Sequence, residues 1–181
     1  MTKKICTLVT VACLGVLCFS GSVLHAQAPV PRTATQTFTV TVPQNISISA
    51  PAAVSLLHDE TDNNQSFANQ PWVVKGNIRN GVLVSFATGS AFVHTQDNTF
   101  QRNAKLDLGL GTTAGPAIWT ITKATDQTDY ATADGIATVE ANSNGVGRAS
   151  FNLGVSFITE EFGLFAAGDY VTTVTGTITA R

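Results

Sequence analysis

Cysteine is the residue that this chain most clearly lacks. Its only three cysteines, Cys6, Cys13 and Cys18, lie within the first 18 of 181 residues. Everything that follows them can form neither a disulfide nor a thiolate metal site. The stability of this region has to come from a hydrophobic core, and the region is long enough to bury one.

Charged side chains are also scarce, at 12% of all residues. After residue 26 the sequence carries eight basic side chains against twelve acidic ones, which gives a mildly acidic surface. The sequence contains no cluster of lysine and arginine of the kind that binds the phosphate backbone of nucleic acids. We therefore expect no nucleic-acid partner.

Residue types that perform catalysis are few. After residue 26 the only histidines are His58 and His94, and the sequence has no Gly-x-Ser-x-Gly nucleophile motif. His58 precedes Asp59 and Glu60, but neighbouring side chains on an extended loop point in different directions and rarely form a catalytic or metal-binding set. We expect that the protein is not an enzyme.

The N-terminal residues 1–26 have the three parts of a signal peptide. Lys3 and Lys4 precede a short apolar run, and Ala26 ends a segment that signal peptidase accepts, which places the mature start at Gln27. The run is shorter than the roughly 20 residues of a membrane span. Lipid attachment to Cys13 or Cys18 is the alternative. We expect an exported protein, extracellular, periplasmic or at the cell surface, without a transmembrane anchor in the mature chain.

The mature chain is expected to contain a flexible leader, residues 27–35, and one domain, residues 36–181. Apolar and polar side chains alternate along many short segments of this domain, which is the pattern of strands with one buried face. Residues 149–157 show the longest alternation, and Trp72 and Trp119 are predicted to fill the core. The pair Asn80 and Gly81 predicts a hairpin between two strands. Residues 36–42 and 46–49, on either side of Pro43, are predicted to form two short strands or one bent strand. Further strands are predicted at residues 71–78, 81–87, 105–110, 117–122, 135–141, 149–157 and 170–179.

This pattern predicts an all-β fold, an immunoglobulin-like or Greek-key β-sandwich of about seven to nine antiparallel strands. Residues 162–165 are expected to form a buried loop or a short turn before the last strand. A closed barrel would show the same local alternation.

Two loops contain candidate ligand-binding residues. Hard oxygen donors gather at Asp59, Glu60, Asp62 and Asn63, which is the chemistry of a calcium site, although the spacing of an EF-hand is absent. An acidic turn without a ligand is the alternative. Tyr130 is the aromatic residue in the most polar loop and the candidate for stacking on a sugar ring. We expect no other cofactor.

The C-terminal third resembles bacterial surface domains. The segments Val155-Ser-Phe, Ala167-Gly-Asp-Tyr and Val174-Thr-Gly-Thr-Ile-Thr are similar to the closing part of spore-coat-U/fimbrial subunits and of WxL cell-wall domains. The resemblance covers about thirty residues. It implies an immunoglobulin-like fold and a surface location, and it transfers no binding residue.

These observations favour a secreted or cell-surface, non-catalytic structural or adhesive protein, with an envelope protein, a surface protein or a glycan as partner. One alternative is an extracellular carbohydrate-binding module. Another is a pilin-like subunit that forms a homo-oligomer, in which the segment beginning at Phe38 would donate a strand to the next copy.

Overall fold

The computed structural model describes residues 30–181. The predicted signal peptide, the cysteines and Gln27 lie outside these residues. The described chain divides into a first unit that ends at Val40 and a second unit, Thr41–Arg181. Residues 30–45 contain no helix or strand, and all of them are exposed. The strand predicted at residues 36–42 is therefore wrong for the isolated chain.

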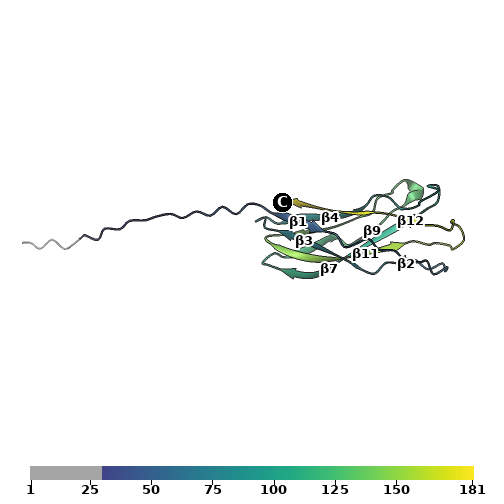
Figure 1. The fold of residues 1–181 in the computed structure, drawn as a ribbon, viewed down its shortest axis with the longest axis horizontal. Helices are drawn as coiled ribbons and strands as arrows, with labels where there is room; N and C mark the ends of the chain where they lie inside the picture. The colour runs from purple at the N-terminus through teal and green to yellow at the C-terminus, as the bar shows by residue number, and fades with distance from the viewer. Residues whose placement is uncertain (1–29) are drawn as a thin grey trace, which may run out of the picture. The chain divides into compact units, whose positions relative to one another are not determined.

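The second unit is built from antiparallel β-sheets (Figure 1). Only strand and one short 3₁₀ turn, η1 (Tyr130–Thr132), form regular structure, so the predicted all-β sandwich is confirmed. In the described residues no helix is long and apolar enough to cross a membrane. The first large sheet has the order β1 (Ile46–Ser49), β3 (Gln70–Gly76), β11 (Gly147–Phe157), β7 (Ala104–Ala114), β9 (Thr125–Gln127), and β2 (Gln65–Ser66) also pairs with β11.

The second large sheet has four strands and packs against the first. The yellow C-terminal strand of Figure 1 is its edge strand, β13, which pairs with β4. A third, smaller sheet extends one end of the sandwich. The second sheet has the order β13 (Val174–Ala180), β4 (Val82–Thr88), β10 (Thr138–Ser143), β8 (Trp119–Lys123), and the third β12 (Tyr170–Val171), β5 (Phe92–His94), β6 (Gln101–Arg102). Eight of the thirteen strands have four or more residues, within the predicted number.

The hydrophobic core lies between the two large sheets. Phe86 of β4 packs against Trp72 of the opposite sheet at 5.2 Å and against Phe151 at 5.9 Å between ring centroids. Trp119 packs on the other side of Phe151 at 5.7 Å. Both tryptophans are buried, and Phe151 is fully buried. The alternation of residues 149–157 and the two tryptophans therefore predicted the core correctly, and Val155 alone on that strand face is only half-buried.

The predicted hairpin at Asn80 and Gly81 is wrong. The strands on either side exist, and Gly81 has a positive φ of 86°, but β3 belongs to the first sheet and β4 to the second. The turn after β10 likewise leads to β11 in the opposite sheet. Among the described strands of the two large sheets, none pairs with its immediate neighbour in sequence. From β3 onward, consecutive strands of the two large sheets alternate between the first sheet and the second.

Candidate binding groove

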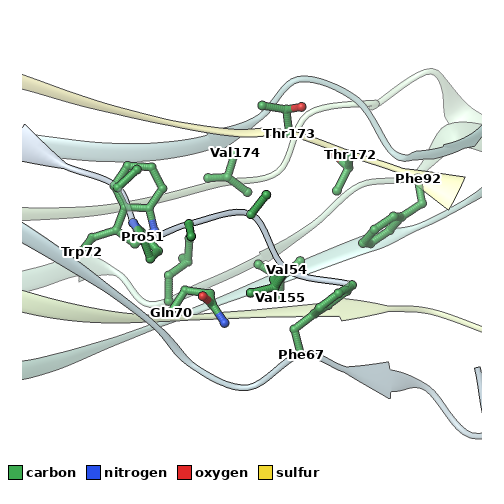
Figure 2. Close-up of a pocket in the computed structure, with 14 residues that line it drawn as sticks. Pro51, Val54, Phe67, Gln70, Trp72, Phe92, Val155, Thr172, Thr173 and Val174 are labelled. Atoms are coloured by element: carbon green, nitrogen blue, oxygen red, sulfur yellow. The ribbon is translucent and has the colours of Figure 1, made fainter. Parts of the chain in front are cut away.

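An apolar groove lies on the side of the sandwich where β1 and β13 are the outermost strands (Figure 2). It has a volume of about 340 Å³, within the range of about 300–1,000 Å³ that is usual for ligand pockets. Residues 50–54, which follow β1, form one of its sides, and residues 172–174 form the other. Figure 2 shows Trp72 toward one end of the lining and Phe67 and Phe92 toward the other, with Pro51 and Val54 on the segment that runs along the groove.

The floor of the groove consists of side chains from the sandwich itself. Trp72 and Leu153 come from the first sheet and belong to the main core, while Phe67 stacks on Phe92 with 6.2 Å between ring centroids. The polar residues along the groove are Gln70, Thr172 and Thr173, and none of the lining side chains is ionisable. The groove can therefore hold apolar side chains, and it offers no acid, base or metal ligand of its own.

Both sides of the groove arise where strand pairing stops. Pairing of β1 with β3 ends at Ser49, before Pro51, which has no N–H to continue the ladder. Within the described residues, the backbone of residues 50–57 makes no hydrogen bond to another part of the chain. On the other side of the groove, Thr172 lies in the short link between β12 and β13. Its hydroxyl donates to the carbonyl of Ser90, a residue outside the lining of the groove, at 2.8 Å. The groove thus has an unpaired backbone along one side.

The groove is closed where β1 and β13 come together. A methyl group added at Gly176 of β13 would lie 2.7 Å from Ile48 Cδ1 and 2.7 Å from Trp72 Cζ3. The inward positions of β13, Val174, Gly176 and Ile178, are half-buried. These three residues therefore share the inner face of the last strand. The lining of the groove includes Val174, the first residue of β13, but neither Gly176 nor Ile178.

The acidic loop uses its oxygen atoms to accept hydrogen bonds from the protein. Asp59 Oδ1 accepts the Thr61 hydroxyl at 2.7 Å, the Thr61 N–H at 3.0 Å and Gln65 Nε2 at 2.7 Å. Thr61, chiefly through its hydroxyl, lowers the pKa of the Asp59 carboxyl from its ordinary 3.8. Asp62 Oδ1 accepts the backbone N–H of Phe162 at 2.7 Å.

The other two candidate calcium ligands are placed differently. The carbonyl of Asn63 accepts the Thr159 hydroxyl at 2.7 Å, and Glu60 has a positive φ of 60°. In the described part of the chain, no group of three or more histidine, cysteine, aspartate or glutamate residues could hold a metal ion. The calcium site stays a prediction, and its candidate oxygens tie residues 58–65 to the loop after β11.

Tyr130 is half-buried rather than freely displayed. Its hydroxyl accepts a hydrogen bond from Arg102 Nη1 at 3.0 Å, and its backbone N–H donates to Asn103 Oδ1 at 3.0 Å. Arg102 itself is buried and lies over the ring of Phe165, 4.7 Å from the ring centre. The polar end of Tyr130 therefore supports a buried cation, and sugar stacking on this ring remains untested.

His58 and His94 each hold a loop in place through hydrogen bonds. His58 Nδ1 accepts the Glu60 N–H at 3.0 Å, and its Nε2 lies 3.1 Å from the Thr159 hydroxyl, which itself donates to a carbonyl. His94 Nδ1 accepts the N–H of Asp97 at 3.0 Å, and its Nε2 lies 3.2 Å from the Ala167 carbonyl. Each ring nitrogen is thus engaged within the protein.

One further sequence prediction needs correction. Residues 162–165 were expected to form a buried loop or a short turn; Phe162 and Gly163 form a turn, but Phe162 is 43% and Leu164 63% exposed. Phe165 packs against Phe157 and Tyr170, and Phe162 stacks on His58 with 5.4 Å between ring centroids. Only part of the apolar surface of this loop packs on the aromatic cluster. Phe162 and Leu164 therefore remain exposed.

The sequence-based reasoning missed the groove. Its only sequence signal is the run Ala50-Pro-Ala-Ala-Val-Ser-Leu-Leu57, which is apolar but lacks the alternation of a strand. The floor residues looked like ordinary core positions. Comparison with protein-family models and with curated proteins finds no match to this chain.

Proposed function

We propose that this protein is an exported, non-catalytic structural or adhesive component of the cell surface that binds an extended protein segment in its groove. The observation that carries the proposal is the combination of an apolar floor with an unpaired backbone beside it. An added strand uses both features, since the main chain supplies affinity and alternate side chains enter pockets. The signal-like residues 1–26 support the location.

The chemistry of the groove favours this proposal over catalysis. Its lining residues carry no ionisable side chain, whereas general acid–base and nucleophilic catalysis both need such groups within hydrogen-bond reach of a substrate. His58 and His94, the histidines of the described chain, do not line the groove and are engaged by backbone and hydroxyl groups.

The experiment that tests the proposed function begins with intact native cells. Brief protease treatment should release peptides from residues 30–181, and fractionation should place the protein in the envelope or medium. A chain with Leu14→Arg and Leu17→Arg, which break the apolar run of the predicted signal, serves as control and should stay inside. Recovery of the unaltered chain among the soluble cytosolic proteins would contradict the proposal.

A pilin-like subunit is a second candidate function. It is favoured by Phe38, Val40 and Val42, which are 83%, 87% and 75% exposed and alternate with threonines. The carbohydrate-binding alternative has less support because the Tyr130 hydroxyl already binds Arg102. Glycan-array binding that disappears in Tyr130→Ala would reverse this order.

A further inference from the structure

One end of the sandwich is basic. It is formed by three connections, residues 77–81 between β3 and β4, 115–118 between β7 and β8, and 144–146 between β10 and β11. The charged side chains in these connections and within two residues of them are Lys75, Arg79 and Arg148, and the same stretches contain no aspartate or glutamate. All three side chains are exposed, and none forms an ion pair in the described chain. The fold thus gathers cations that are dispersed in the sequence.

The three connections lie against one another, with residues 144–146 in the middle. The Ala117 N–H donates to the Val146 carbonyl at 3.1 Å, which joins this connection to the one after β7. A methyl group added at Gly145 would lie 3.9 Å from the Arg79 carbonyl oxygen, so the connection after β3 is also adjacent. Together they present one surface at this end.

Two of the cations face each other across a hollow. Lys75 and Arg148 are directly opposite in the ladder between β3 and β11, a position in which like charges destabilise a sheet. Both line an open hollow of about 620 Å³, together with Gly115 and Val146 of the connections. The hollow therefore offers two unpaired cations to an anionic group from outside the molecule.

Apolar side chains are exposed beside these cations. Ile118 is 67% and Val146 is 42% exposed, and the two belong to connections that are hydrogen-bonded to each other. The surface of an anionic bilayer suits both kinds of side chain, because its phosphate groups attract lysine and arginine and its acyl boundary accepts apolar groups. A soluble acidic polymer would engage the cations only.

We propose that this end of the sandwich docks on a bilayer that contains anionic phospholipid. The phosphate of a head group enters the hollow between Lys75 and Arg148. Ile118 and Val146 enter the boundary between head groups and acyl chains. The apolar groove shares no lining residue with the hollow, so a docked protein can still bind an extended segment. The inference goes beyond the proposed function and does not depend on the groove.

Co-sedimentation with vesicles tests the inference, with the protein in the form in which it is purified from native cells. Vesicles of phosphatidylcholine are compared with vesicles in which part of this lipid is replaced by phosphatidylglycerol. The protein should bind the anionic vesicles, and salt should release it because salt screens exposed charges. Equal binding to the two kinds of vesicle, or binding to neither, would overturn the inference.

Two charge-matched double variants locate the contact. The first is Lys75→Gln with Arg148→Gln, and the control is Lys105→Gln with Lys123→Gln, two cations outside this end that pair with Asp107 and Asp126. The first variant should bind anionic vesicles roughly twenty-five-fold more weakly, about fivefold for each cation. The control should bind like the parent chain. Circular dichroism checks that both variants are folded, and equal losses in the two would overturn the assignment of this end.

A second pair of variants distinguishes a bilayer from an acidic polymer. The first is Ile118→Ser with Val146→Ser, and the control is Leu164→Ser with Val171→Ser, whose side chains are 63% and 53% exposed elsewhere. The first should bind anionic vesicles roughly tenfold more weakly, because less apolar surface leaves water, and the control should bind like the parent chain. Unchanged binding in the first variant, or binding to soluble polygalacturonate without binding to vesicles, would overturn bilayer docking.

Discussion

Replacing Gly81 with alanine would test how closely two connections between the sheets pack against each other. One joins β3 to β4 and contains Gly81, and the other joins β10 to β11. Gly81 has a φ of 86°, and an added methyl group would lie 2.0 Å from the carbonyl oxygen of Ser143 at the end of β10. Ser143 is fully buried, and its hydroxyl lies 3.0 Å from the Val82 nitrogen, whose N–H it accepts. The clash can be relieved only by moving one connection away from the other.

Two costs add at Gly81. A residue with a side chain in a left-handed conformation costs about 1–2 kcal/mol, and an extra methyl group forced into a packed region costs about 1–3 kcal/mol. The sum of about 2–5 kcal/mol corresponds to a decrease in Tm of roughly 6–25 °C for a domain of this size. Thermal unfolding followed by circular dichroism measures this decrease.

Two other glycines separate the two costs. Gly163 has a φ of 96°, but a methyl group there would have no atom within 4 Å, so Gly163→Ala should show the conformational cost alone. Gly145 lies in the opposing connection, and its added methyl group would be 3.9 Å from the nearest atom, the Arg79 carbonyl oxygen, so Gly145→Ala should change Tm little. A Gly81→Ala chain that melts no lower than Gly163→Ala would refute the packing of these connections.

Three further predictions concern the charged groups. The Thr99 hydroxyl lowers the pKa of Asp97, as Thr61 lowers that of Asp59, so this stabilisation is present above the ordinary value of 3.8 and is lost as the pH falls through the folded-state pKa. The pH dependence of Tm below pH 4 should therefore be shallower in Thr99→Val than in the parent chain. Excess calcium should not raise Tm relative to chelator, because Asp59 Oδ1, Asp62 Oδ1 and the Asn63 carbonyl already accept protein hydrogen bonds; a bound ion would raise it. Arg102→Met should match or exceed the parent in urea-unfolding free energy, since Arg102 is buried with Nε unpaired in the described chain and its nearest carboxylate 3.9 Å away. A loss of several kcal/mol would show that the aromatic cluster depends on the cation.

The alternation of side chains predicted the strands because it depends only on which face of a strand is buried. Residues 149–157 and the inner face of β13 follow this rule. The pairing of the strands was not predictable in the same way, because strands of both sheets carry the same alternation. Gly81 shows the difficulty: a positive φ suits a hairpin turn and a connection between sheets equally well, and only contacts with Ser143, 62 residues away in sequence, distinguish the two.

The candidate site was less predictable for a related reason. The acidic loop has the residue types of a calcium site, but the groups that occupy its oxygens include the N–H of Phe162, which lies 100 residues from Asp62. No local pattern shows such a contact. The groove depends on where pairing stops, after Ser49 and between β12 and β13, and this position follows from the three-dimensional path of the chain.

The physical rule that explains the core also shows what residues 37–42 lack, which is a surface to cover their apolar face. In β11, alternation places Phe151 and Leu153 inside the sandwich, where each is no more than 1% exposed. In residues 37–42, which form no strand, an equally regular alternation leaves Phe38, Val40 and Val42 at least 75% exposed, where they contribute no burial energy.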